Sequence, residues 1–245
     1  SFHGEKTGFF GFFECEESQE TAALLLGAAE QFAREQGMDT LRGPFNYSTN
    51  ETCGLLTNAY DEMPYLMMPW NFPYYEGLIT GAGFHKAMDL LSYHLDDTLF
   101  SFERIGKLEE RVAKKDGVTL RRVDFSRFRE EIRTIQQIYN SAWEKNWGFV
   151  PMTDAEFEFM AKELRPIVNA DLLWIGEIEG KAAGFALCLP DYNIVLKKMN
   201  GRLWPFGILK ALWHKRNINR VRIITLGIIR EFRLSGLDIL MYSKI

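Results

Sequence analysis

The stretch IITLGIIREFRLSGL, residues 223–237, decides the fold that this sequence predicts. Its first part is an apolar run rich in β-branched residues, which favours a strand that ends near Gly227. A polar turn with Arg233 and Gly236 follows, and an apolar segment with helical character begins at Leu237. The first N–H groups of a helix have no partner inside the helix and carry partial positive charge. A strand that enters a helix through such a turn therefore predicts an anion-binding site.

This segment resembles the acyl-CoA-binding motif of the GNAT superfamily, the Gcn5-related N-acyltransferases. In that family a strand is followed by Arg/Gln-x-x-Gly-x-Gly/Ala at the start of a helix, and Arg233, Gly236 and Asp238 occupy those positions here. Asp238 departs from the pattern, because a carboxylate stands where the family has Gly or Ala. The resemblance implies an α/β (α+β) fold of GNAT-like units, each a mixed twisted sheet flanked by helices. It also implies transfer of an acyl group from acetyl-CoA or another acyl-CoA to an amine, in a small molecule or a peptide.

The charged residues are distributed unevenly along the sequence. The chain has 245 residues, 47% of them hydrophobic, which is enough for one large domain or two smaller ones. The net charge is only -4, yet residues 192–230 contain no Asp or Glu. The basic residues of that stretch are Lys197, Lys198, Arg202, Lys210, Lys215, Arg216, Arg220, Arg222 and Arg230. Such a field would attract a polyanion, namely CoA, RNA or an anionic membrane, although a solvated basic helix face would look the same.

Three cysteines, Cys15, Cys53 and Cys188, are too few and too far apart for a disulfide framework or a metal site. We expect Cys15 and Cys188 to pack as small apolar residues. No apolar run is long enough to cross a bilayer, and a cytoplasmic protein without a metal is expected. The positions at which the sequence starts and stops suggest a chain truncated at both ends.

The first 105 residues resemble the second half of a GNAT unit. Patterning predicts strands at 7–15 and 84–95 and helices at 19–36 and 74–80. The turn before the first helix has no Arg-x-x-Gly motif. It is acidic instead, with Glu14, Glu16 and Glu17, so this half is not expected to bind CoA.

Residues 106–117 form a charged connector, and residues 118–245 resemble the first part of a second GNAT unit with the CoA motif. The predicted elements are a strand at 118–123, helices within 124–146 and at 155–164, a hairpin of 172–178 and 181–189, and a strand at 220–227. We expect that last strand to lie centrally in the sheet, next to residues 181–189. The chain would then be the middle of a tandem protein.

The resemblance also assigns roles to individual residues. Backbone groups of Leu226, Gly227 and Ile228 would bind the pantetheine arm, and a backbone N–H near Ile228 would polarise the acyl carbonyl. The pyrophosphate would be held by Arg233 and by the N–H groups of Leu234, Ser235, Gly236, Leu237 and Asp238.

The acid–base and acceptor-binding residues are less closely specified. GNAT enzymes usually carry a carboxylate general base on the strand before the CoA motif, but residues 220–229 contain no Asp or Glu. The nearest candidates in this sequence are Asp191 and Glu177. Both could equally be solvated acids of the hairpin. Asn146, Trp147 and Phe149 lie in the loop that walls the acceptor pocket in the family, although the aromatic rings could simply pack beneath that loop.

Two further functions stay open at this point. A FemX-like transferase would use aminoacyl-tRNA, with the basic segment 197–222 in contact with the RNA. The alternative of a non-catalytic GNAT-like binding module is consistent with Asp238, which replaces the Gly or Ala of the CoA-binding motif. A basic amphipathic helix within 203–216 could contact tRNA or a membrane surface, or could cover an edge of the core.

Overall fold

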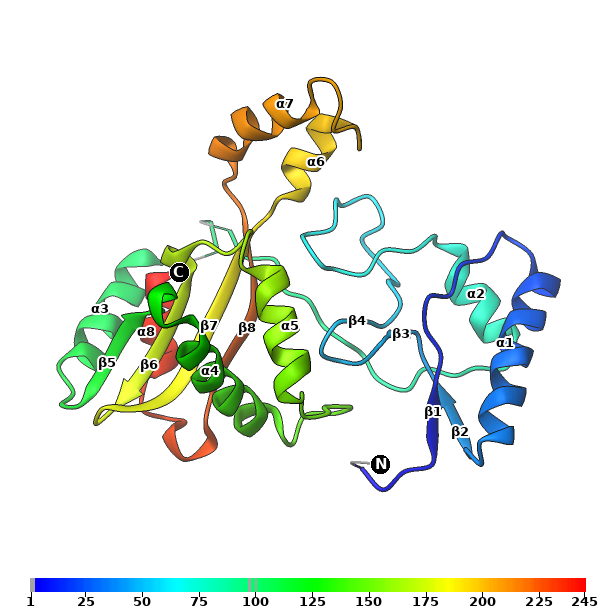
Figure 1. The fold of residues 1–245 in the computed structure, drawn as a ribbon, viewed down its shortest axis with the longest axis horizontal. Coiled ribbons are helices and arrows are strands. Elements are labelled where there is room, and N and C mark those ends of the chain that lie inside the picture. Colours follow the sequence, from blue (N-terminus) through cyan, green and yellow to red (C-terminus); the bar gives the residue numbers. More distant parts are fainter. Residues whose placement is uncertain (1–2, 97, 100) are drawn as a thin grey trace. The chain divides into compact units, whose positions relative to one another are not determined.

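The computed structural model describes residues 3–96, 98–99 and 101–245, which fall into two compact units (Figure 1). The first unit comprises Ser1–Tyr93 with Gly148–Val150, and the second comprises His94–Trp147 with Pro151–Ile245. Both units combine helices with strands, so the predicted α+β class is confirmed. No helix among the described residues has the length and apolar character needed to cross a membrane.

The first unit is built from two helices and two small sheets. Helices α1 (Gln19–Glu35) and α2 (Tyr74–Gly81) lie close to their predicted positions. The parallel pair joins β1 (Thr7–Phe9) to β2 (Thr40–Arg42), and the antiparallel pair joins β3 (Phe45–Asn46) to β4 (Thr52–Cys53). Phe10, Leu26 and Ile79 form the buried centre of this unit.

The predicted strand at residues 84–95 is wrong, because among the described residues this segment pairs with no other strand. The predicted strand at 7–15 is likewise reduced to Thr7–Phe9, and Phe12 has a positive φ of 51° that interrupts the extended backbone. An apolar pattern favours extended backbone, but a strand also needs a partner for its N–H and C=O groups. In residues 84–95 side chains such as Leu91 and Tyr93 are instead exposed.

The second unit contains a four-stranded antiparallel sheet in the order β5-β6-β7-β8. The strands are β5 (Val118–Arg122), β6 (Leu173–Ile178), β7 (Lys181–Pro190) and β8 (Val221–Ile228). The predicted pairing of β8 with β7 is confirmed. The predicted central position of β8 is wrong, since β8 is an edge strand of this sheet: no later strand among the described residues pairs with it.

Helices cover both faces of this sheet. On one face lie α4 (Phe128–Trp143), whose Ile132, Ile135 and Ile138 are buried, and α5 (Asp154–Leu164), which packs on α4. Thr153 caps α5 and exchanges side-chain and backbone hydrogen bonds with Glu156, a capping box. On the other face α8 (Leu237–Lys244) packs on all four strands, and α3 (Phe102–Ala113) packs on α8.

The remaining helical segments lie in the connections. Helices α6 (Asn193–Met199) and α7 (Gly207–His214) form a hairpin inserted between β7 and β8. Helix α7 lies within the range 203–216 predicted to be helical, whereas α6 was not predicted. Short 3-10 turns occupy Phe125–Arg127, Ala170–Leu172, Lys215–Asn217 and Arg230–Phe232.

Cys188 should resist thiol reagents as long as the protein is folded. Its side chain on β7 is fully buried, and burial raises the pKa of the Cys188 thiol to about 12, because a thiolate would lose its hydration. The pKa of Cys188 is higher in the folded than in the unfolded protein. Its contribution to the free energy of unfolding is therefore fully present below the unfolded pKa and is lost as the pH rises from there toward 12.

We therefore expect alkylation of Cys188 at pH 8 only at the rate of unfolding, whereas the partly exposed Cys15 and Cys53 are modified first. Peptide mass spectrometry after timed iodoacetamide treatment measures this order. Labelling of Cys188 as fast as Cys53 would contradict the burial.

Candidate functional site

The turn between β8 and α8 has the geometry predicted for an anion site. Residues 233–236 lie in neither a strand nor a helix, which confirms their predicted place in the turn. Leu234 and Gly236 have left-handed backbone, with φ of 76° and 89°. Gly236 is the N-cap residue of α8, so the positive end of this helix faces the turn.

Gly236 is required by two independent features. Its positive φ favours glycine, and a Cβ at this position would lie 2.7 Å from Cγ2 of Val112 on α3. Ser235 completes the turn, because its hydroxyl accepts a hydrogen bond of 3.2 Å from the N–H of Leu237. Among the described residues, the N–H groups of Leu234 and Asp238 donate to no other protein group. They are therefore free to donate to a ligand.

A cavity of about 410 Å³ opens beside this turn. It is formed entirely within the second unit, between the end of α4, the end of β8 and the start of α8. Six of the nine predicted cofactor-binding residues line it. The lining residues are Ala142, Trp143, Asn146, Leu226, Gly227, Ile228, Arg233, Leu234 and Asp238. Ser235, Gly236 and Leu237 do not line the cavity and lie in the turn and at the start of α8.

Trp143 packs directly against Gly227 in this cavity. A Cβ on Gly227 would overlap the indole ring at Cη2 and Cζ3, so only glycine allows this contact. The ring is held in place by Tyr139, stacked at a centroid distance of 4.9 Å, and by Phe185 at 5.9 Å. The indole therefore forms a fixed apolar wall next to the strand backbone.

Arg233 places a positive charge at the same cavity. Its Nη2 donates to the carbonyl of Ala142 at 3.0 Å, and its Nε lies 3.4 Å from the carbonyl of Ile228. These contacts orient the guanidinium without neutralising it, because both acceptors are uncharged carbonyls. Arginine has five N–H donors, so donors remain for an anionic ligand. Asp238 opposes this charge with a carboxylate that also lines the cavity.

Neither of the two predicted general bases lines the cavity, and each of them forms an ion pair. Asp191 is fully buried, and its Oδ2 lies 2.6 Å from Nη2 of Arg220. Glu177 on β6 lies 2.6 Å from Nε of Arg121. Each carboxylate thus has a structural partner that the sequence pattern did not reveal.

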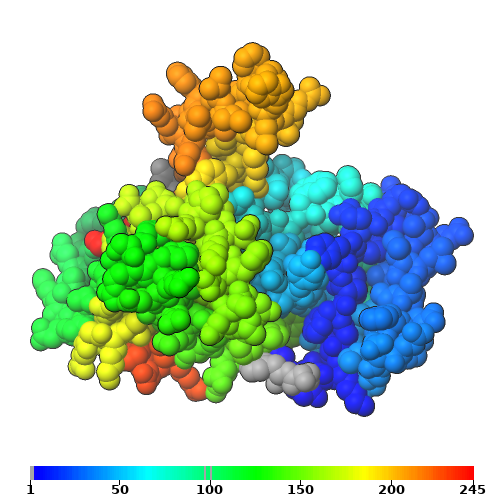
Figure 2. Space-filling view, in the orientation of Figure 1, coloured from blue at the N-terminus to red at the C-terminus, as the bar shows by residue number. Residues whose placement is uncertain are grey.

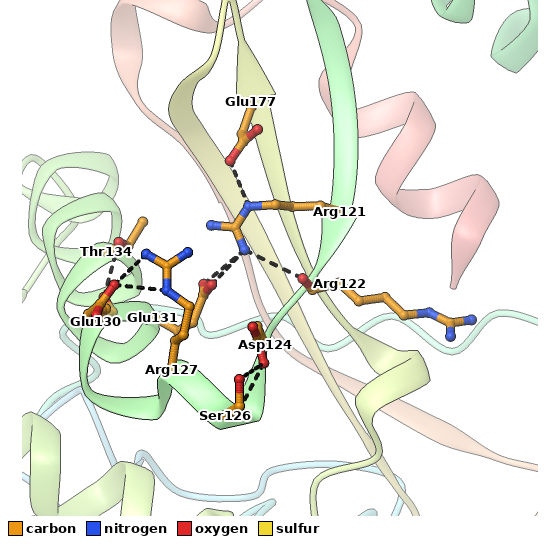
Figure 3. A network of polar contacts seen from close by, with 9 residues as sticks. All are labelled: Arg121, Arg122, Asp124, Ser126, Arg127, Glu130, Glu131, Thr134 and Glu177. Carbon is orange, nitrogen blue, oxygen red and sulfur yellow. Dashed lines mark hydrogen bonds and ion pairs between the residues drawn. The ribbon is translucent and has the colours of Figure 1, made fainter.

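Arg121 links two carboxylates across this face of the sheet (Figure 3). Its Nη1 lies 2.8 Å and 3.0 Å from the two oxygens of Glu131, which is 4% exposed on α4. Burial alone would lower the pKa of Arg121, but the hydrogen bonds and charges of Glu131 and Glu177 raise it overall. The network therefore ties α4 to β5 and β6.

The three predicted acceptor-binding residues do not form one group. Asn146 lines the cavity, whereas Trp147 does not. Phe149 belongs to the first unit, is 3% exposed, and has its carbonyl 2.7 Å from Nε2 of His3.

Trp143 was missed by the sequence analysis, although two signals pointed to it. It follows Tyr139 by four residues on the apolar face of α4, and Gly227 inside a strand indicates a close approach by another group.

Comparison with known proteins adds two relatives. The chain is 36% identical over 236 residues to Protein YghO of Escherichia coli (strain K12), a match that covers 95% of this chain and 60% of that protein. It is 35% identical over 237 residues to Bacterial ceramide synthase of Caulobacter vibrioides (strain NA1000 / CB15N), with 95% of this chain and 61% of that protein covered. The chain thus spans about 60% of the length of these relatives.

No protein-family model matches the chain. Among solved structures, a mutant of agmatine N-acetyltransferase in its apo form aligns with 52% of this chain and 69% of its own, at 14% identity and a TM-score of 0.29. That likeness is too low to support an argument about the fold.

If the turn binds CoA, as the motif at Arg233–Asp238 predicts, removing the carboxylate of Asp238 should strengthen that binding. Two like charges about 5 Å apart at a partly screened site repel by about 1–3 kcal/mol. We therefore expect Asp238→Asn, which keeps the side chain's shape, to lower the Kd for CoA roughly tenfold. Titration calorimetry measures this change. Glu231→Gln, in the preceding 3-10 turn and outside the cavity lining, is the matched control. An unchanged Kd would mean that the carboxylate does not face the ligand.

Proposed function

We propose that the second unit binds an acyl-CoA thioester beside Gly227 and transfers its acyl group to an amine. The observation that carries this proposal is the cavity at the β8–α8 turn, where strand backbone, an oriented arginine and a helix N-terminus meet. A helix N-terminus and an arginine are the groups that proteins use to bind phosphate. The cavity volume of about 410 Å³ suits part of such a ligand, with its diphosphate at the solvent-exposed turn.

Each lining group has a role in this proposal. The backbone of Leu226 and Gly227 would run along the pantetheine arm, with the indole of Trp143 on its apolar side. The guanidinium of Arg233 and the free N–H groups of the turn would hold the diphosphate. Asn146, which also lines the cavity, would supply a polar contact for the acyl carbonyl or the amine.

The reaction follows from these positions. The amine nitrogen attacks the thioester carbonyl, and a backbone N–H near Ile228 stabilises the oxyanion that forms. The carbon–sulfur bond then breaks, CoA leaves as the thiolate, and the nitrogen loses its proton to a general base, directly or through water. The product is an amide together with free CoA. Asp191 and Glu177 stay candidates for that base, although each would have to act from within an ion pair.

The name of one relative suggests the class of acceptor. Ceramide is the amide of a fatty acid and a long-chain amino alcohol, so a ceramide synthase makes an amide bond on a lipid amine. We propose the same chemistry for this chain, with a fatty acyl-CoA as donor and a long-chain amino alcohol as acceptor. This choice is narrower than the small-molecule or peptide amine that the sequence alone predicted.

A direct test mixes the chain with palmitoyl-CoA and sphinganine and follows the amide by mass spectrometry and the released thiol by colorimetry. We expect both products in equal amounts. CoA binding without amide would favour the non-catalytic binding module, and binding of tRNA in place of CoA would favour the aminoacyl-tRNA-dependent alternative. Either result would overturn the proposal.

Replacement of Arg233 tests the site itself. Arg233→Ala removes a cation that would bond the diphosphate, and charge-assisted hydrogen bonds contribute about 1.5–3 kcal/mol. We expect the Kd for CoA to rise at least roughly tenfold. Arg230→Ala is the matched control, since Arg230 is an exposed arginine of the preceding 3-10 turn and does not line the cavity. Equal losses in both variants would indicate non-specific attraction.

A further inference from the structure

The α6–α7 hairpin projects from one end of the second unit's sheet, between β7 and β8 (Figures 1 and 2). Its two helices pack on each other, with Met199 of α6 close to Gly207 of α7. Val195, Met199 and Gly207 are all buried. None of its residues lines the cavity beside Gly227. The hairpin is therefore not needed to form the proposed active site.

The outer face of α7 is apolar and exposed. The less exposed residues, Gly207, Ala211 and His214, are spaced at helical intervals and define the inner face. The outer face carries a stripe of four residues, each more than half exposed: Ile208, Leu209, Leu212 and Trp213. A helix in water normally turns its apolar stripe toward the protein, whereas α7 turns it away. This orientation indicates a partner for the stripe outside the hairpin.

The turn that leads into α7 extends this apolar surface. Leu203, Trp204 and Phe206 are all more than 60% exposed, and Trp204 reaches 83%. Soluble proteins seldom expose large apolar patches without an interaction that uses them. Tryptophan is enriched at the boundary between lipid and water, where its ring and its N–H group meet different surroundings. Both Trp204 and Trp213 stand on this surface.

The charge of the hairpin matches an anionic partner. No Asp or Glu occurs between Tyr192 and Arg230. The hairpin and its 3-10 turn carry the basic residues Lys197, Lys198, Arg202, Lys210, Lys215 and Arg216. Lys215 lies 5.7 Å above the ring of Tyr192, and Lys197, Lys198 and Lys210 are exposed. Aliphatic and aromatic side chains flanked by lysines are typical of protein segments that lie in a membrane interface.

We propose that the α6–α7 hairpin docks this protein on the surface of an anionic lipid bilayer. The stripe of α7 and the Leu203–Phe206 turn would enter the headgroup region, while the lysines contact anionic headgroups. RNA fits less well, because it would use the cations and the two indoles but leave Ile208, Leu209 and Leu212 in water. The inference rests on exposed residues alone and stands whether or not the Gly227 cavity binds acyl-CoA.

Vesicle flotation tests this docking. The probes are vesicles of phosphatidylcholine alone and of phosphatidylcholine with phosphatidylglycerol at about 7:3, a composition that gives a negative surface. We expect the chain to float with the anionic vesicles, to do so at least tenfold less with the neutral ones, and to be released at high salt. Bromine-labelled acyl chains should quench tryptophan fluorescence, because Trp204 and Trp213 enter the bilayer.

Two sets of variants separate the apolar from the electrostatic contribution to vesicle binding. Trp204→Ser with Trp213→Ser should reduce flotation at least tenfold and abolish the quenching, whereas Phe159→Ser, an exposed aromatic of α5, should change neither.

Lys198→Glu with Lys210→Glu should abolish the preference for anionic vesicles. Lys181→Glu, at the opposite end of β7 from the hairpin, is the matched control. Circular dichroism melts verify that every variant folds.

Three outcomes would overturn the inference. The first is no flotation with either vesicle, and the second is flotation that the hairpin variants leave unchanged. The third is a dimer or a tRNA complex, detected by light scattering or gel shift, that the tryptophan variants dissolve while vesicle binding is absent. That result would assign the surface to a second copy of the chain or to RNA.

Discussion

Replacing Gly227 with valine is expected to abolish binding of acyl-CoA. Even a single Cβ at this position would overlap the indole ring of Trp143, and valine adds two methyl groups beyond it. The ring cannot withdraw freely, because Tyr139 and Phe185 pack on it. Overpacking of this kind costs about 1–3 kcal/mol of stability. The displaced ring and the new side chain would also fill the cavity, so we expect the Kd for CoA to rise by more than about a hundredfold.

Titration calorimetry with CoA and urea denaturation of the same samples separate loss of the site from loss of the fold. Gly106→Ala is the matched control, since Gly106 lies in α3 with open space around its Cβ position. Alanine favours helix there by about 1 kcal/mol over glycine, so this variant should bind CoA normally and be slightly more stable. Normal CoA binding by a folded Gly227→Val would show that the ligand does not use this cavity.

The turn between β8 and α8 was predictable because its signals are local in the sequence. The β-branched run before Gly227 favours a strand by itself, and Gly236 satisfies the positive φ that the turn requires. The helix then begins at Leu237, where the apolar segment with helical character was predicted to begin. The strand, turn and helix signals agree over fifteen residues, so the sequence alone locates the turn and most of the residues around it that line the cavity.

The wall of the cavity was not predictable in the same way. Trp143 and Gly227 are far apart in the sequence, and their contact depends on how α4 crosses the sheet. The same holds for residues 84–95, whose pattern suits a strand but which pair with no other strand among the described residues. Pairing in a sheet is a tertiary property, so an apolar pattern predicts extended backbone and leaves the partner unspecified.

Ion pairs escaped prediction for a related reason. Glu177 and Asp191 were selected as the nearest acids to the strand that became β8. No periodic signal distinguishes a catalytic acid from one that pairs with an arginine. The partners, Arg121 and Arg220, lie more than twenty-five residues away in the sequence from the acids they meet. Only the folded sheet shows that both acids already have a cation within hydrogen-bonding distance.

Replacing Arg220 with methionine is expected to destabilise the second unit strongly. Asp191 has no exposed surface, and Nη2 of Arg220 lies 2.6 Å from its Oδ2, so the variant removes the ion pair of a buried carboxylate. Removing one partner of a buried ion pair typically costs about 3–5 kcal/mol. Urea denaturation of the variant measures the loss. Arg216→Met is the matched control, an exposed arginine that should change stability by less than about 0.5 kcal/mol.

The companion change in Asp191 separates a structural from a catalytic role. Combining Asp191→Asn with Arg220→Met removes both charges, so the double variant should be more stable than Arg220→Met alone. If Asp191 is only a structural partner, the folded double variant should still transfer acyl groups at a rate within about threefold of the parent. If Asp191 is the general base, Asp191→Asn alone should lower kcat by about a hundredfold or more while the Kd for CoA stays unchanged. An Arg220→Met variant as stable as the parent would show that this pair is not buried in solution.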